Sequence, residues 1–448
     1  MAKPTHAPRL THVQVIALGF AIMILAGTLL LMLPAASADG QSAPFREALF
    51  TAVSSSCVTG LVLRDTATAW SFFGQVIIIV LIQIGGLGFM TVATFAFLLA
   101  QKRMGLRSRE IMLESINNSN MNGIVQFSGE IIAGTAIFEG TGALLLATVF
   151  VPRMGWKKGL WYSVFHAISA FCNAGFDLMG FQEPFSSFVS MADNVVVNVT
   201  FMLLIILGGL GFLVWHDIRV NGFHFKRYSL HTKLVLTVSA VLVFGSALLI
   251  LIFERNATGA GLPFGQQVMN ALFASVTART AGFNTIDIPS MSNGSKLVTI
   301  LLMVVGGSPG STAGGVKTTS IAVIVLYMVG GFRGSRKPAV FGKSINPDLF
   351  RKSCIILFFN AGLALMATLI LAGLQNFDLV DIMFETFSAV GTVGMTAGIT
   401  RDLLPVSSYI IALLMFMGRV GSVSFAVALL EKKAKPPVTY PEETVTVG

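Results

Sequence analysis

Long apolar segments alternate with shorter ones along most of this chain. Eight apolar runs are long enough for membrane-spanning helices, and a shorter apolar segment separates the two members of each successive pair. A helix of twelve residues is about 18 Å long, too short to cross a hydrocarbon core of about 30 Å. The pattern therefore predicts spanning helices interleaved with short helices that enter the membrane and return.

The alternation predicts one structural unit repeated four times, in which a span, a short segment and a second span follow one another. The expected spans lie at 13–34 and 70–100, 127–151 and 190–215, 231–253 and 295–330, and 353–374 and 405–430. The short segments run over 45–56, 160–171, 264–278 and 379–390. The predicted repeats are 12–100, 110–218, 228–332 and 348–432, followed by a tail at 433–448.

A small-residue turn built around one glycine follows each short segment. The turns are Val58-Thr59-Gly60, Asn173-Ala174-Gly175, Thr280-Ala281-Gly282 and Thr392-Val393-Gly394. Irregular backbone at membrane depth is tolerated only where it is buried in protein or lines water. Four such loops on one axis can form a ring of backbone carbonyls that replaces the hydration shell of a cation. The fold class expected is an all-α polytopic membrane protein, with four repeats of transmembrane helix, pore loop and transmembrane helix around a pseudo-fourfold pore.

The fourth turn is the most specific of these signals. Thr392-Val393-Gly394 matches the Thr-Val-Gly core of potassium-channel filter loops. We therefore interpret the twelve turn residues as an ion-selectivity filter that binds potassium through backbone carbonyls. The other three turns keep the glycine and vary before it, so the pore would have four unlike walls.

Repeat three interrupts its second span with a glycine-rich segment, which glycine and proline would keep from being helical. The segment is Gly306-Gly307-Ser308-Pro309-Gly310-Ser311-Thr312-Ala313-Gly314-Gly315. Its place below the filter makes it a candidate gate, and the alternative is a kink that serves packing alone. The second spans of the other repeats carry related glycines at 85–88, 208–211 and 418–421. In repeats one and two we interpret these as sites of close helix packing.

Two arginines and a set of carboxylates add to the candidate site. Arg419 lies within the last span, where an arginine is costly, so we expect it to contact carbonyls of the 306–315 segment and to oppose cation flow. The alternative is that its side chain reaches the membrane interface. Arg279 is expected to point away from the filter, with Glu385 as a partner. The carboxylates that follow the turns can concentrate cations at the pore mouth: Asp65, Asp177, Asp287 and Asp402.

Composition and charge support a membrane protein and exclude other classes. The chain is 54% hydrophobic and 11% charged, against about 25% charged residues in soluble domains. Of the 30 Lys and Arg residues, 19 fall in the terminal and inter-repeat segments, which predicts that both termini are cytoplasmic. This distribution explains the net charge of +9 through topology, so no nucleic-acid partner is expected. No catalytic motif, metal-ligand cluster or dinucleotide fingerprint occurs, so we expect neither an enzyme nor an organic cofactor.

Over about residues 12–430 the chain resembles the superfamily of potassium transporters that includes the Trk, Ktr and HKT proteins. The segments that carry the resemblance are 56–61, 279–284, 306–315 and 391–394, followed by Arg419. It resembles the Ktr-type membrane subunit most closely, because the first repeat begins almost at the first residue. The resemblance implies a homodimer in the cell inner (plasma) membrane, with one pore per protomer. It also implies membrane lipid around the dimer and a cytoplasmic ring of nucleotide-binding (RCK-type) regulatory subunits that controls the gate.

Other functions stay open at this point. A secondary cation transporter would have broken helices and a midplane site, although it predicts two interrupted helices where four parallel units recur here. A less selective sodium and potassium pathway is a further alternative, and the sequence leaves the role of sodium as an activator undecided.

Overall fold

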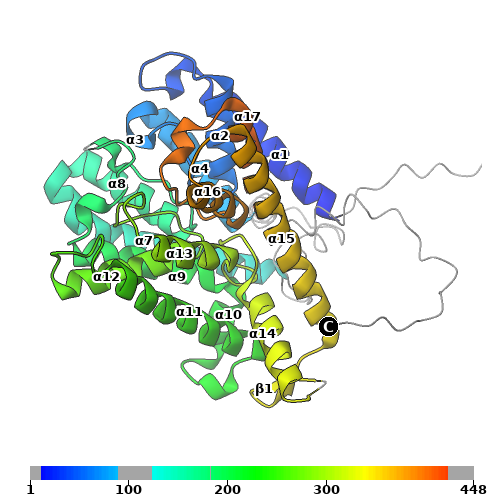
Figure 1. The fold of residues 1–448 in the computed structure, drawn as a ribbon. Helices are drawn as coiled ribbons and strands as arrows, with labels where there is room; N and C mark the ends of the chain where they lie inside the picture. Colours follow the sequence, from blue (N-terminus) through cyan, green and yellow to red (C-terminus); the bar gives the residue numbers. More distant parts are fainter. Residues whose placement is uncertain (1–11, 89–123, 182, 336, 422–448) are drawn as a thin grey trace, which may run out of the picture.

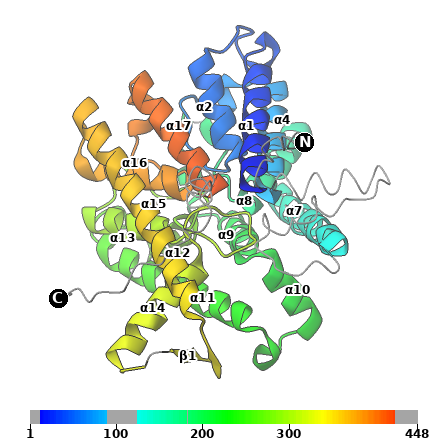
Figure 2. The ribbon, with the colours of Figure 1, turned by 90° about the vertical axis from the view of Figure 1, so that its right-hand side faces the viewer.

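The computed structural model describes residues 12–88, 124–181, 183–335 and 337–421. The first half contains α1 (His12–Leu31), α2 (Phe45–Ser56), α3 (Thr66–Ala69), α4 (Phe72–Leu87), α7 (Ile124–Met154), α8 (Trp156–Phe171), α9 (Val195–Leu210) and α10 (Phe212–Asn221). The second half contains α11 (Leu230–Glu254), α12 (Phe264–Thr277), α13 (Asn293–Val304), α14 (Thr318–Phe332), α15 (Pro347–Leu374), α16 (Leu379–Gly391) and α17 (Pro405–Val420). The strands β1 (Ala339–Val340) and β2 (Lys343–Ser344) form a small antiparallel hairpin. Both views place α14 and this hairpin at one end of the molecule (Figures 1 and 2).

In the described residues, four helices are long and apolar enough to cross a membrane: α1, α7, α11 and α15. The second spans are built differently. α9 and α10 are two helices bent by 94° at Gly211, so the segment expected as a span over 190–215 is not one straight helix. The interrupted span expected over 295–330 is the pair α13 and α14, with an irregular segment between them. The predicted residues 89–100, the start of repeat two at 110, residues 422–432 and the tail 433–448 lie outside the described residues.

The four short helices are present close to their predicted positions. α2 covers the predicted range without change, and α12 and α16 each differ from it by one residue at their carboxyl ends. α8 begins four residues before the predicted start, at Trp156, because the chain reverses at Gly155, which has a φ of 80°. The apolar runs were sufficient to predict these elements because each ends at a turn of small residues.

The packing order of the helices closes a ring. Each long helix packs against the short helix that follows it: α1 on α2, α7 on α8, α11 on α12 and α15 on α16. The next helix then packs against the short helix of the following unit: α4 on α8, α9 on α12, α13 on α16, and α17 on α2. The last contact joins the end of the described chain to its beginning, so the contacts around the four short helices close into a ring.

The glycines of the second spans do two things. A Cβ at Gly85 would lie 2.0 Å from the carbonyl oxygen of Ser56, and one at Gly208 would lie 1.9 Å from that of Phe171. The expected close packing is therefore present, at the carboxyl ends of α2 and α8. The last glycine of each series also ends a helix, in a left-handed conformation that favours glycine, with φ of 83° at Gly88 and 95° at Gly211. The sequence analysis missed these helix ends.

Candidate functional site

The four small-residue turns share one backbone conformation. The residue two positions before each glycine has positive φ although it is not glycine: Val58 at 49°, Asn173 at 57°, Thr280 at 73° and Thr392 at 49°. The glycines follow with φ of 102° at Gly60, 71° at Gly175, 84° at Gly282 and 91° at Gly394. Non-glycine residues rarely adopt this conformation, so its occurrence at one position in all four turns indicates a shared functional constraint.

Hydrogen bonds from the preceding short helix hold each turn in place. The amide of the residue before the glycine donates back to the helix end, at 2.8 Å from Thr59 to the Ser54 carbonyl and from Val393 to that of Ser388. The hydroxyls of Ser54 and Ser388 also accept from the amides of Gly60 and Gly394, each at 3.0 Å. Sequence analysis did not single out these serines, although a serine six residues before the glycine in turns one, two and four is the signal for them.

The four glycines form a closed ring in chain order. A Cβ built on each would meet a carbonyl oxygen of the next turn: Gly60 that of Ala174 at 2.7 Å, Gly175 that of Ala281 at 2.9 Å, Gly282 that of Val393 at 2.7 Å, and Gly394 that of Thr59 at 1.9 Å. Because glycine has no Cβ, the four turns can approach one another this closely through their backbones. Since the short helices end at these turns, the negative ends of their dipoles are directed at the ring and favour a cation there.

A cavity of about 110 Å³ opens on one side of the ring. All four glycines line it, together with three of the four carboxylates singled out from the sequence, Asp65, Asp177 and Asp287. In the described residues Asp402 is not part of this lining, and the neighbouring Arg401 is. The acidic side chains make the cavity attractive to cations.

The three carboxylates of the cavity differ in their surroundings. Asp65 caps α3 and also accepts from the Phe185 amide at 3.0 Å, so it fixes the cavity wall. Burial above all, together with the nearby Asp65 carboxylate, raises the pKa of the Asp177 carboxyl from 3.8 to about 7. Asp287 is exposed and accepts from the hydroxyl of Ser290. The three carboxyl groups are therefore distributed between a buried wall and the open rim of the cavity.

Two buried hydroxyls beside the ring have no hydrogen-bond partner in the part of the chain that the structure describes. They are the Oγ1 atoms of Thr59 and Thr392, which precede Gly60 and Gly394. Buried polar atoms are normally paired, and one left unpaired is a place to look for a ligand.

The predicted gate, 306–315, packs directly against the turns. A Cβ at Gly314 would lie 2.1 Å from Oγ1 of Thr392, and the Thr312 hydroxyl donates to the Phe171 carbonyl at 3.1 Å. The break between α9 and α10 holds the other side. The Ser308 amide donates to the Gly209 carbonyl at 2.9 Å, and the Phe212 amide donates to the Gly310 carbonyl at 2.7 Å. The segment therefore links the turns of repeats two and four.

Arg419 connects this segment to two other repeats. Its guanidinium donates to the carbonyl of Thr312, which is the kind of contact expected from the sequence, and also to the carbonyls of Gly85 and Gly86 at the end of α4. The expected pairing of Arg279 with Glu385 is wrong. Arg279 donates to the Ser239 hydroxyl at 3.2 Å, and Glu385 accepts from the Thr396 and Thr400 hydroxyls.

These features define a multi-pass helical membrane protein built for the passage of cations. Family comparison identifies the class more closely: the model of the TrkH family, described as cation transport protein, matches residues 10–435, and the chain belongs to that family.

Similar proteins and one solved structure agree with this assignment. The potassium/sodium uptake protein NtpJ of Enterococcus hirae is 40% identical, with 98% of each chain covered. The Ktr system potassium uptake protein B of Bacillus subtilis is 37% identical, covering 98% of this chain and 97% of that one. The crystal structure of the potassium transporter TrkH from Vibrio parahaemolyticus superimposes with a TM-score of 0.72 at 16% identity, covering 96% of this chain and 86% of that chain. At 16% identity, the match to this crystal structure shows that the two chains share a fold.

Proposed function

We propose that this chain is the membrane subunit of a potassium uptake system, and that ions cross at the ring formed by Gly60, Gly175, Gly282 and Gly394. The observation that carries the proposal is the closure of that ring, in which each glycine faces a carbonyl of the next turn. The acidic cavity and the unpaired hydroxyls of Thr59 and Thr392 support it. Backbone carbonyls and hydroxyls are oxygen donors of the kind that replace the hydration shell of potassium.

The names of the relatives support potassium as the transported ion, with sodium as a second transported ion or an activator. The name of the Ktr system supports a partner protein. We propose that this partner is a cytoplasmic RCK-type nucleotide-binding ring, and that the chain is a homodimer in the plasma membrane with both termini cytoplasmic. The repeat boundaries 12–100, 110–218, 228–332 and 348–432 belong to the same proposal, and the ring of helix contacts supports them.

We further propose that the 306–315 segment is the gate and that Arg419 holds it shut. Replacing Arg419 with glutamine is expected to raise potassium flux several-fold, because the variant loses the charged hydrogen bonds to Thr312 and to the end of α4. The measurement is the initial rate of potassium uptake into proteoliposomes at equal protein content. The matched control is Arg351→Gln, which removes an exposed cation on α15. Equal rates in both variants would show that Arg419 does not hold the gate.

The proposed function is tested by flux through the purified chain. Potassium and sodium uptake would be measured into proteoliposomes that hold this chain alone, and again after addition of a cytoplasmic nucleotide-binding partner. Flux that favours potassium in the first condition supports a pore whose partner is regulatory. Flux that appears in the second condition alone supports a gate that is closed by default. Absence of flux in both would contradict the pore and favour a secondary transporter, whose broken helices the bend between α9 and α10 resembles.

A further inference from the structure

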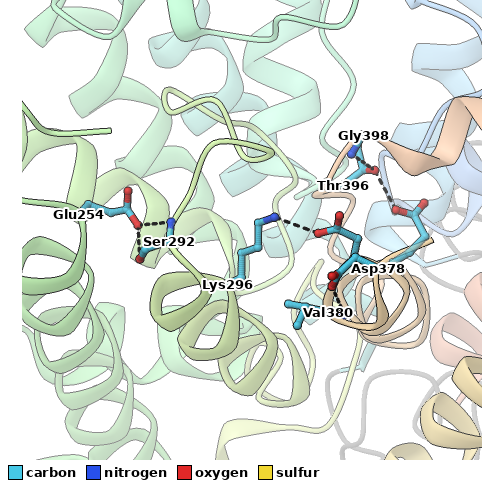
Figure 3. A network of polar contacts seen from close by, with 9 residues as sticks. Glu254, Ser292, Lys296, Asp378, Val380, Thr396 and Gly398 are labelled. Carbon is cyan, nitrogen blue, oxygen red and sulfur yellow. Dashed lines mark hydrogen bonds and ion pairs between the residues drawn. The ribbon is translucent and has the colours of Figure 1, made fainter. Parts of the chain in front are cut away.

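Glu385 is a fully buried carboxylate behind the fourth turn. It lies on α16, and its two oxygens accept from two threonine hydroxyls, that of Thr396 at 2.8 Å and that of Thr400 at 2.5 Å. Thr396 in turn accepts from the amide of Gly398 at 3.0 Å (Figure 3). A carboxylate is costly to bury, so its retention at membrane depth indicates a role for the contacts that it makes.

These contacts fix the chain that leaves the fourth turn. Thr396 follows Gly394 by two residues, and both threonines line the acidic cavity. Glu385 comes from the short helix that leads into the turn, so the carboxylate joins the two arms of the loop on either side of Gly394. The Ser388 hydroxyl holds the amide of Gly394 from the same helix. The position of the Gly394 backbone is therefore set from both directions.

The same position in repeat two makes a comparable contact. Glu385 stands nine residues before Gly394, and His166 stands nine residues before Gly175. The Nε2 atom of His166 accepts from the amide of Leu178, which follows its turn, at 2.9 Å. The equivalent residues of the other repeats are Thr51 and Phe273. The carboxylate thus occurs in the repeat whose turn is Thr-Val-Gly, where the match to a potassium filter is closest.

The helix that carries Glu385 is itself held from outside. One turn earlier, Asp381 forms an ion pair with Lys296 of α13 at 2.9 Å (Figure 3). This ion pair joins α13 of repeat three to α16 of repeat four. The Lys296 side chain is mostly buried. A carboxylate on a fixed helix can determine where the loop that it binds lies.

We propose that Glu385 is a positioning residue for ion specificity: it holds Thr396 and Thr400, and through them the Gly394 backbone, in the geometry that distinguishes potassium from sodium. The inference rests on the proposed function, because it assumes that ions pass the glycine ring. It assigns Glu385 no direct contact with the ion.

The test compares the ratio of potassium to sodium flux in variants reconstituted as the complete chain with the partner that supports flux. Glu385→Ala removes both acceptors and is expected to lower the ratio about tenfold, equivalent to about 1.4 kcal/mol. Glu385→Gln keeps the shape and one carbonyl acceptor and is expected to retain most of the ratio. Thr400→Val removes one of the two hydroxyl donors to Glu385, and its effect should be non-additive with that of Glu385→Ala.

The matched control is Glu254→Ala. Glu254 is also a buried carboxylate, and it accepts from the hydroxyls of Thr258 and Ser292 at 2.6 and 2.7 Å, away from the ring. A lower ratio in Glu385→Ala and Thr400→Val with a wild-type ratio in Glu254→Ala supports the proposal. An unchanged ratio in folded Glu385→Ala or in Thr400→Val, or an equal loss in Glu254→Ala, overturns it. A Gly394→Ser variant distinguishes failure of this inference from failure of the proposed function. If the ratio is unchanged in that variant as well, the glycine ring is not the filter.

Discussion

Replacing Gly394 with serine is expected to lower the ratio of potassium to sodium flux by about tenfold or more, the largest loss of selectivity for any single change in the ring. A Cβ at this position would lie 1.9 Å from the carbonyl oxygen of Thr59, a distance that atoms do not adopt. Either that carbonyl or the turn itself must move. The φ of 91° adds backbone strain for any residue with a Cβ. The measurement is paired potassium and sodium uptake into proteoliposomes.

The control for this variant is Gly261→Ser. Gly261 has a similar φ of 80°, and a Cβ there would meet no atom within 4 Å, so the variant carries the strain without the collision. Gly60→Ser provides a graded comparison, because its Cβ would lie 2.7 Å from the carbonyl of Ala174. We expect the ratio of potassium to sodium flux to fall most in Gly394→Ser and less in Gly60→Ser, and to stay at the wild-type value in Gly261→Ser. Wild-type selectivity in a folded Gly394→Ser protein would mean that the fourth turn is not the filter.

The sequence predicted those parts of the fold that depend on short stretches of chain. The residues of α2 and the turn glycines follow from an apolar segment that ends in small residues, a signal contained within about twenty positions. The convergence of the turns could be expected because four copies of one pattern call for one arrangement. The contact of Arg419 with the glycine-rich segment followed from the cost of an isolated charge in a membrane.

The features that the sequence analysis missed depend on partners far away in the chain. Lys296 and Asp381 are separated by 85 positions, and nothing local marks them as a pair. Arg279 was assigned the wrong partner because a carboxylate is the usual choice for an arginine, whereas the fold supplies Ser239 from α11. The bend at Gly211 was read as close packing because a glycine in an apolar run serves either purpose equally well.

Deleting Ser308–Thr312 is expected to raise potassium flux about tenfold or more, since several hydrogen bonds of about 1 kcal/mol each would be lost from the closed segment. The deleted residues supply the Gly310 carbonyl that Phe212 binds and the Thr312 carbonyl that Arg419 binds. The ends of the deletion already meet, because a Cβ at Gly307 would lie 2.4 Å from the Cβ of Ala313. The flanking helices α13 and α14 can therefore keep their positions.

The second measurement in this experiment adds Arg419→Gln to the deletion. If both changes act through one contact, the arginine substitution raises flux in the intact chain and adds nothing once Thr312 is absent, because their effects are coupled. Additive effects would place Arg419 elsewhere in the pathway, through its contacts with Gly85 and Gly86. Thermal unfolding of each variant checks that the helices remain assembled. If the folded deletion variant keeps the wild-type flux, the 306–315 segment is a kink that serves packing alone and is not the gate.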